Sequence, residues 1–291
     1  MPTESTLALA GLDDDLAGLD SLEIPVERTA SLPVRVWSIT WPKVAAIGLV
    51  ILGWQTLVWV HWRKTYQLVP PLQVGRRLWD DFGTADLWGA VGATMRRAVV
   101  GFAIAIVIGV VIGLAVSVSR HVRVAIGSLI SGLQTMPSIA WFPLALLLFR
   151  LSESAIYFVV VLGAAPSIAN GLIGGVDSVP PLLRRVGRSM GASSTSLYRD
   201  FVVPAAMPSV VAGLKQGWAF AWRSLMAGEL LVVIPGTQTI GTRLFYAREL
   251  SDPEGLMATM VVILIVGILV DSLVFGRLER HVLRRRGLGH P

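Results

Sequence analysis

Long uncharged runs alternate with short charged segments along most of the chain. A bilayer core about 30 Å thick is crossed by about 20 apolar residues in a helix. Runs of that size predict membrane-spanning helices at about residues 43–62, 95–118, 124–149, 154–175, 205–234 and 255–276. We therefore expect an all-α fold, a polytopic membrane protein with six transmembrane helices.

Tryptophans mark both ends of the first run. Trp37 and Trp41 precede it, and Trp59 and Trp62 lie at its other end. The segment from Trp41 to Trp59 rises about 27 Å at 1.5 Å per residue in a helix. This length matches the separation of the aromatic belts at the two membrane surfaces, so the run is predicted to cross the bilayer.

Composition favours the same class of protein. Of the 291 residues, 54% are hydrophobic and only 15% are charged, and the mean hydropathy is +0.66. Soluble domains are about 25% charged, so a soluble enzyme is disfavoured and a disordered or fibrous chain is excluded. A pI near 10.3 suits cationic membrane loops better than nucleic-acid binding in so apolar a chain. The absence of cysteine excludes disulfides, thiolate nucleophiles and cysteine-ligated metals.

The distribution of lysine and arginine predicts the orientation and the domain limits. Basic residues are densest at Arg277–Arg286, and translocating this run would be costly, so both termini are expected in the cytoplasm. Residues 1–35 form an acidic cytoplasmic tail that lacks the basic start and apolar core of a secretory signal. The transmembrane domain is expected at 36–285, followed by a short cytoplasmic tail at 286–291.

The segment 177–204 differs from the other connections between the runs. It is polar, cytoplasmic in the predicted orientation, and longer than most connections in compact bundles. Its helix-compatible stretches break at Gly191 and Pro204. A solvated connector is one interpretation, and a docking surface for another protein is the functional one.

Several motifs in and around this segment occur in one order and spacing. They comprise Gly191-Ala192-Ser193, Tyr198, Phe201, Val202, Pro204, Pro208 and Gly213-Leu214, together with Gly101-Phe102, Pro137–Leu144, Glu153 and Ala227-Gly228-Glu229. Over about residues 95–275 this pattern resembles the permeases of binding-protein-dependent ABC importers. The detailed match resembles the nitrate, sulfonate and taurine subfamily.

This resemblance implies an ABC importer type I permease fold and a division of labour between subunits in a bacterial inner membrane. Two copies would form a central path for a sulfonate, taurine, nitrate or bicarbonate. Two separate ATP-binding subunits would hold ATP and Mg²⁺, and an extracytoplasmic solute-binding protein would deliver the solute. The remaining partner is membrane lipid, and neither nucleic acid nor a cofactor of this chain is implied. The residues implied to contact the ATP-binding subunit are Arg185, Arg188, Gly191, Ala192, Ser193 and Tyr198.

Two features of the docking segment follow from the residues themselves. Gly191 permits a bend between two short helices, and Ser193 can cap the second one. One feature departs from the family, which usually has Glu-Ala-Ala where this chain has Arg185-Val186-Gly187. The charge of the contact is therefore inverted here, and we expect an ATP-binding subunit adapted to it. The chain has no Gly-x-x-x-x-Gly-Lys-Ser/Thr phosphate loop, so it is expected to be a permease subunit and not an ATPase.

The fifth predicted span contains three charged residues, Lys215, Arg223 and Glu229. Charges inside a membrane are costly and mark functional candidates. Arg223 is either a fixed cation that favours an anionic solute in the path, or a structural residue paired with Glu229 or with carbonyls of a neighbouring helix. Arg223 and Glu229 are six residues apart, so their side chains leave a helix in directions about 240° apart around its axis. Pairing between them within the helix is therefore disfavoured. Lys215 is close enough to the cytoplasmic end to reach it.

The predicted translocation path comprises Trp218, Trp222, Arg223 and Glu229. The two tryptophans share a helix face at i and i+4, which suits an aromatic gate or, alternatively, packing against lipid or protein. Asn170 is expected to form a hydrogen bond between helices. Asp271 is expected to contact Arg277. Pairs of glycines at four-residue spacing are assigned to close helix packing.

Two other classes of function remain open as alternatives. A secondary transporter driven by an ion gradient would need inverted repeats and buried acids, and the chain shows no such repeat. An intramembrane enzyme is weakly supported, because the four histidines lie at span ends or in tails without metal-ligand spacing. No metal site is therefore predicted.

Overall fold

The computed structural model describes residues 32–64, 67–118 and 120–284. Every regular element in these ranges is a helix. The chain divides into two compact units, Met1–Trp59 and Val60–Pro291, which are taken separately. Residues 1–31 of the predicted acidic tail and the predicted tail at 286–291 lie outside the described residues.

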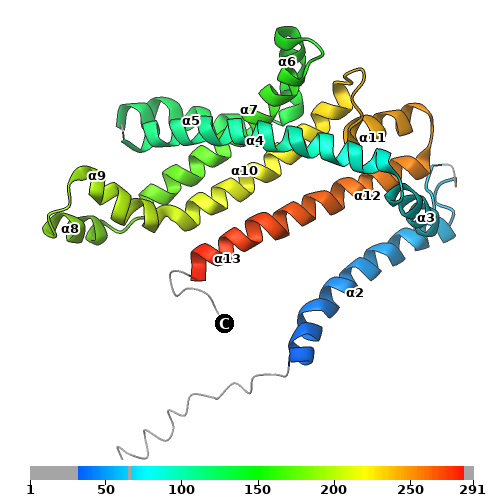
Figure 1. Cartoon of the computed structure of the whole chain (residues 1–291), viewed down its shortest axis with the longest axis horizontal. Coiled ribbons are helices and arrows are strands. Elements are labelled where there is room, and N and C mark those ends of the chain that lie inside the picture. The colour runs from blue at the N-terminus through cyan, green and yellow to red at the C-terminus, as the bar shows by residue number, and fades with distance from the viewer. Residues whose placement is uncertain (1–31, 65–66, 119, 285–291) are drawn as a thin grey trace, which may run out of the picture. The chain divides into compact units, whose positions relative to one another are not determined.

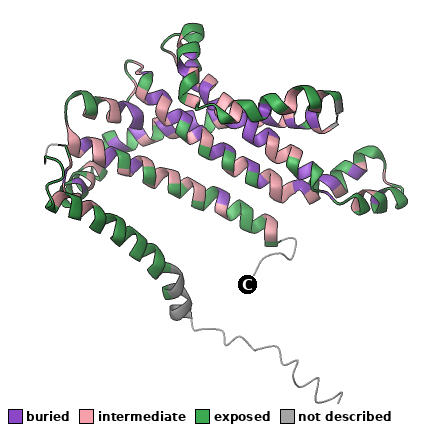
Figure 2. Cartoon of the chain, turned by 180° about the vertical axis from the view of Figure 1, so that it is seen from behind, coloured by how far each residue is buried: buried purple, intermediate pink, exposed green. Residues whose placement is uncertain are grey.

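The described part of the first unit is one helix, α2 (Leu32–Trp59; Figure 1). Its segment Thr40–Trp59 is long and apolar enough to cross a membrane, and none of its most apolar part is buried (Figure 2). A helix that exposes apolar side chains on all faces suits a lipid environment. The first predicted span is therefore helical, although the helix ends at Trp59 and not near residue 62.

The second unit contains the other helices of the described ranges. In chain order they are α3 (Pro71–Phe82), α4 (Ala85–Val118), α5 (Arg120–Thr135), the 3₁₀ turn η1 (Ser138–Trp141), α6 (Phe142–Phe149), α7 (Glu153–Asp177), α8 (Pro181–Ser189), α9 (Ser194–Ser196), the π-helical turn η2 (Leu197–Val202), α10 (Val203–Leu231), α11 (Ile240–Glu249), α12 (Pro253–Val270), the π-helical turn η3 (Asp271–Phe275) and α13 (Gly276–Arg284) (Figure 1).

Helix α7 forms the centre of this unit, packed against both α4 and α10. Its buried face is made of small and β-branched residues, including Val159, Val160 and Ala164. These contact Ala105 of α4 and Leu225 of α10 in one apolar core. The purple segments in Figure 2 follow these central helices.

Glycines permit the closest contacts in this core. A Cβ added to Gly171 of α7 would lie 2.5 Å from the Cα of Gly213 in α10. A Cβ on Gly109 of α4 would lie 2.8 Å from the carbonyl oxygen of Ala165 in α7. No side chain fits at such distances, so these glycines set the separation of the helix axes. Their assignment to packing is confirmed.

Among the described residues, four helical segments are long and apolar enough to cross a membrane. They are Thr40–Trp59, Ala85–Ser117, Glu153–Asp177 and Pro253–Arg284. The pair His121–Thr135 and Ser138–Phe149, bent by 104°, makes a fifth if it counts as one span. Pro137 lies at this break, where it removes a backbone donor that a continuous helix would use.

The fifth predicted span, α10, does not pass the same test of apolarity. Its 29 residues would extend about 43 Å at 1.5 Å per residue, so its length is sufficient. Lys215, Arg223 and Glu229 lower its apolar character, and its central part packs on α7. Its place in the fold is therefore set by protein contacts as well as by hydropathy.

The predicted docking segment folds as two short helical pieces joined at a glycine. Gly191 has a positive φ of 80°, which side chains with a Cβ rarely adopt. The Ser193 hydroxyl accepts a hydrogen bond from the Ser196 amide at 3.2 Å, so the predicted cap is present. A Cβ on Gly187 of α8 would lie 2.5 Å from Leu197 of η2, and this contact fixes the two pieces against each other.

Candidate functional site

Helix α10 has one exposed stripe opposite its buried face. The stripe follows Ala212, Gln216, Ala219 and Arg223, at helical positions i, i+4, i+7 and i+11. Arg223 is eight residues from the end of α10 at Leu231, about 12 Å along the axis. A guanidinium at this depth of a membrane helix is costly against lipid. The stripe therefore suits contact with water or with another protein.

The guanidinium of Arg223 is held by its own helix. Its Nε donates to the Ala219 carbonyl oxygen at 3.1 Å, and its Cζ lies 4.8 Å from the centroid of the Phe220 ring. Both contacts hold the side chain, the second as a cation–π interaction. No carboxylate within the described ranges pairs with Arg223, so pairing with Glu229 is wrong. The two Nη groups remain available as donors.

Arg223 lines a pocket of about 300 Å³ beside the break between α5 and η1. The other lining residues are Phe220 of α10, Gly163 of α7 and the run Leu133, Gln134, Thr135, Met136, Pro137, Ser138 and Ile139. None of these residues is acidic. The pocket thus combines one cation, several apolar side chains and a few neutral polar groups.

The predicted hydrogen bond of Asn170 is present, and its partner lines this pocket. Its Nδ2 donates to Oε1 of Gln134 at 2.7 Å, which joins α7 to α5. The prediction that Asn170 bonds between helices is therefore confirmed. Gln134 itself was not singled out from the sequence, because nothing local indicates that it reaches the same pocket as Arg223.

Trp218 and Trp222 do not occupy an open path. Trp218 is 5% exposed and packs edge-on against Phe102, with ring centroids 5.3 Å apart. It also contacts Phe275 and Trp222, and Trp222 lies against Gly267 of α12. The predicted aromatic gate does not fit these positions, because residues of α4, α12 and η3 pack around the two indole rings. The alternative interpretation, packing against protein, fits them.

Glu229 likewise does not fit the predicted path, because its side chain has no exposed surface. Its Oε2 accepts from the Thr94 hydroxyl at 2.9 Å and from the Gly241 amide at 3.1 Å. Its Oε1 pairs with Arg97 at 3.4 Å. We therefore reassign Glu229 from the path to a buried ion-pair cluster.

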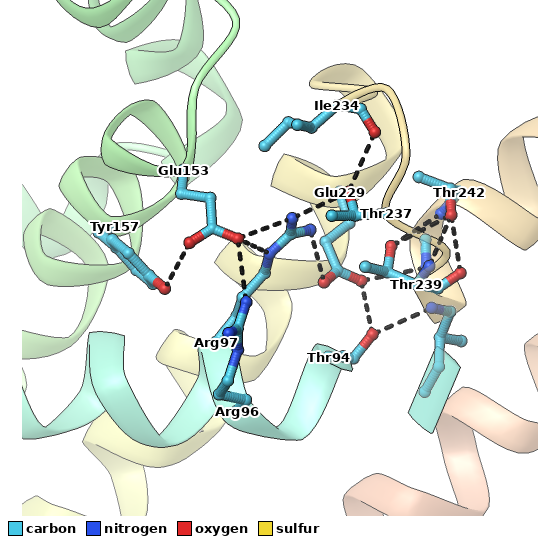
Figure 3. Close-up of polar contacts among 12 residues, drawn as sticks. Thr94, Arg96, Arg97, Glu153, Tyr157, Glu229, Ile234, Thr237, Thr239 and Thr242 are labelled. Carbon is cyan, nitrogen blue, oxygen red and sulfur yellow. Dashed lines mark hydrogen bonds and ion pairs between the residues drawn. The ribbon is translucent and has the colours of Figure 1, made fainter. Parts of the chain in front are cut away.

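Arg97 is the centre of this buried ion-pair cluster, as Figure 3 shows. Its side chain is 1% exposed and lies between Glu229 and Glu153, with Arg97 Nη2 3.0 Å from Glu153 Oε1. It also donates to the Thr237 hydroxyl at 3.3 Å. The cluster joins α4, the start of α7, the last turns of α10 and the start of α11. Arg97 was not predicted from the sequence, because the two acids that pair with it, Glu153 and Glu229, lie far away in the chain.

Asp271 has a different partner from the one expected from the sequence, and that partner is Lys215. Lys215 Nζ lies 3.2 Å from Glu279 of α13 and 4.0 Å from Asp271 of η3. The expected contact between Asp271 and Arg277 is therefore wrong. Lys215 instead links α10 to η3 and α13.

The predicted docking residues form an exposed basic surface. The exposed ones are Arg185, Arg188, Gly191, Ser193 and Tyr198, and Ala192 is partly buried. In the part of the chain that the structure describes, neither Arg185 nor Arg188 has a carboxylate partner. The apolar side chains of Leu182 in α8 and of Met190, directly after α8, are also strongly exposed. A mixed apolar and basic surface of this kind suits a protein partner.

The helical bundle, its candidate spans and the pocket on the exposed face of α10 define a multi-pass membrane transport protein. The chain belongs to the family of binding-protein-dependent transport system inner membrane components, which matches residues 105–285.

Three relatives illustrate the range of this similarity. The taurine transport system permease protein TauC of Escherichia coli (strain K12) is 28% identical over 234 residues, which are 79% of this chain and 84% of that protein. The nitrate import permease protein NrtB of Synechocystis sp. is 28% identical over 80% of this chain and 87% of that protein. The bicarbonate transport system permease protein CmpB of Synechococcus elongatus is 29% identical over 66% and 68%, respectively.

Solved structures show the same fold. A chain of the inward facing MetNI methionine ABC transporter matches with a TM-score of 0.58 and 19% identity, over 67% of this chain and 95% of that one. A chain of an amino acid ABC transporter matches with a TM-score of 0.53 and 16% identity, over 69% and 94%. The fold is therefore the type I permease fold of ABC importers.

Proposed function

We propose that this chain is the transmembrane permease subunit of an ABC importer that moves a small anionic solute into the cell. Family membership supports the class of transporter. The relatives named above are taurine, nitrate and bicarbonate permeases, and each of these solutes carries an oxyanion group. The solute of this chain is proposed to belong to the same chemical class.

The main observation in support of an anionic solute is the environment of Arg223. Its guanidinium lies on an exposed stripe of α10, beside a pocket without acidic lining, and lacks a carboxylate partner in the described ranges. A fixed cation attracts an anion more strongly in a low-dielectric surrounding than in bulk water. A path lined in this way favours an anion and disfavours a cation.

The partners follow the division of labour in the family. Two copies of the chain would enclose the path, and each would dock one ATP-binding subunit through residues 177–204. ATP and Mg²⁺ would bind to those subunits, and a solute-binding protein would act on the opposite side of the membrane. The exposed basic and apolar side chains of α8 support the docking role, with both termini on the cytoplasmic side.

A transporter driven by an ion gradient fits the site less well. Such a mechanism needs an acid that can bind and release the coupling ion. Glu229, the carboxylate of the fifth predicted span, is fully buried and paired with Arg97. It also accepts two further hydrogen bonds, so the coupling ion has no free carboxylate here.

Uptake by intact cells tests the proposal with all partner subunits present. Cells with and without this chain would be given labelled taurine, an alkanesulfonate, nitrate and bicarbonate, and a cationic solute as a control. We expect chain-dependent uptake of at least one anion, which stops when ATP is depleted and persists briefly after a protonophore collapses the proton gradient. Uptake of the cation alone, or uptake that follows the proton gradient, would contradict the proposal.

A further inference from the structure

The pocket beside Arg223 contains a second hydrogen-bond donor of fixed orientation. Gln134 of α5 and Arg223 of α10 both line it. The amide oxygen of Gln134 accepts a hydrogen bond from Asn170, with 2.7 Å between the two atoms. An amide group is planar, with its oxygen and its NH₂ group at opposite corners. The hydrogen bond from Asn170 therefore determines which group of the Gln134 amide, the oxygen or the NH₂, is left for other partners.

That remaining corner is the NH₂ group of Gln134. Across the described ranges, no acceptor pairs with its Nε2. Gln134 is partly exposed and borders the pocket, so its two N–H groups are open to a ligand there. Arg223 is in the same condition, since only its Nε is used. Two groups that can only donate thus border one pocket.

We propose that Gln134 and Arg223 together form an oxyanion site in the translocation path, and that Asn170 is its positioning residue. Asn170 keeps the carbonyl oxygen of Gln134 occupied, so that the amide presents donors to the anion. Two donors on separate helices can contact two oxygens of one sulfonate, nitrate or bicarbonate group. This inference rests on the proposed function and assigns the groups that recognise the solute.

The surrounding residues give these contacts a partly apolar setting. Leu133, Met136, Ile139 and Phe220 supply apolar surface beside the two donors. Hydrogen bonds to a charged group are stronger than those to a neutral one, and an apolar setting strengthens them further. No acidic residue lines the pocket, so the donors have no internal competitor for the anion.

Substituting Asn170 by aspartate tests the positioning role directly. A carboxylate accepts hydrogen bonds but does not donate them, so in Asn170→Asp the Gln134 amide would turn its NH₂ group to residue 170. Its oxygen would then face the anion. We expect binding of the anion to weaken at least about tenfold. The measurement is equilibrium binding of labelled taurine, nitrate and bicarbonate to the complex purified through this chain, without the solute-binding protein.

A double variant separates the turned amide from the added negative charge. In Gln134→Met the donor is absent, and binding should weaken by a similar factor. Adding Asn170→Asp to Gln134→Met should then change little, because residue 170 acts through Gln134. If the aspartate weakens binding equally in both backgrounds, its charge is responsible and the positioning role is refuted. Ser131→Ala of the same helix serves as a control, since Ser131 bonds only to the Gly127 carbonyl.

The same assay distinguishes this inference from the function on which it rests. If Arg223→Gln abolishes binding while Gln134→Met and Asn170→Asp bind normally, the two-donor site is refuted and the proposed function stands. If Arg223→Gln also binds every anion normally, the anion site on α10 is refuted as well. The three labelled anions show which oxyanion the site prefers.

Discussion

The buried cation of Arg97 gives the sharpest test of the fold. In Arg97→Met the cation is removed, and the carboxylate of Glu229 remains fully buried without its ionic partner. Breaking a buried ion pair from one side costs about 3–5 kcal/mol. The loss is offset only by the hydrogen bonds that Glu229 still accepts from Thr94 and Gly241. For a chain of this size, each kcal/mol shifts the melting temperature by about 2–4 °C, so a decrease of about 6–20 °C is expected.

Arg96 offers a matched control at the adjacent position. It contacts the same oxygen of Glu153, 3.4 Å away, but its side chain is 67% exposed. Exposed ion pairs contribute only about 0–1 kcal/mol, so Arg96→Met should lower the melting temperature by no more than about 4 °C. Arg96 and Arg97 are thus the same residue type at adjacent positions, and they differ in how far the side chain is buried.

The assay is thermal unfolding of the detergent-solubilised chain, followed by the loss of its monodisperse peak in size-exclusion chromatography. The double variant Arg97→Met/Glu229→Met should melt well above Arg97→Met, because it leaves no unpaired charge in the core. The reasoning is refuted if Arg97→Met melts within about 2 °C of the unmodified chain, or if the double variant shows no recovery.

Three further substitutions test other parts of the structure. Arg223→Gln should lower the maximal uptake of the anion at least about tenfold, whereas Arg223→Lys should keep part of it, because charge at this position attracts the solute. Equal uptake by both variants and the unmodified chain would show that Arg223 is not in the path. Gly191→Val should abolish the stimulation of ATP hydrolysis by solute in the reconstituted complex. Gly191→Asn should retain this stimulation, because asparagine tolerates the positive φ of 80°. Preserved stimulation in the valine variant would count against docking at this turn. Gly171→Leu should prevent stable folding, because its Cβ would lie 2.5 Å from the Cα of Gly213. A Cβ on Gly127 would meet no atom within 4 Å, so Gly127→Leu should fold normally, and equal melting temperatures of the two variants would show that α7 and α10 are not in this contact.

Local properties of the chain are enough to predict the helices and the turn of the docking segment. A run of apolar residues long enough to cross a bilayer is recognisable without its neighbours, because the membrane and not a protein partner selects it. Gly191 and Ser193 are equally local, since their roles depend on a backbone angle and on a hydrogen bond three residues away. The separation of Arg223 and Glu229 on α10 also follows from helix geometry alone.

The partners of the charged and aromatic side chains depend on tertiary structure. Glu229 and Arg97 are 132 residues apart, and their pairing requires α4 and α10 to meet. The spacing of Trp218 and Trp222 places them on one helix face, but only the contacts with Phe102, Phe275 and Gly267 show that this face is buried.

The sequence by itself thus determined the class of protein, most of its spans and the bend at Gly191, because hydropathy and backbone preference act over a few residues. Only the tertiary structure decided that Glu229 is buried in an ion-pair cluster and that Arg223 borders a pocket with Gln134. The energy of a charge depends on the solvent and the opposite charges around it, and in this fold both are supplied by helices distant in the chain.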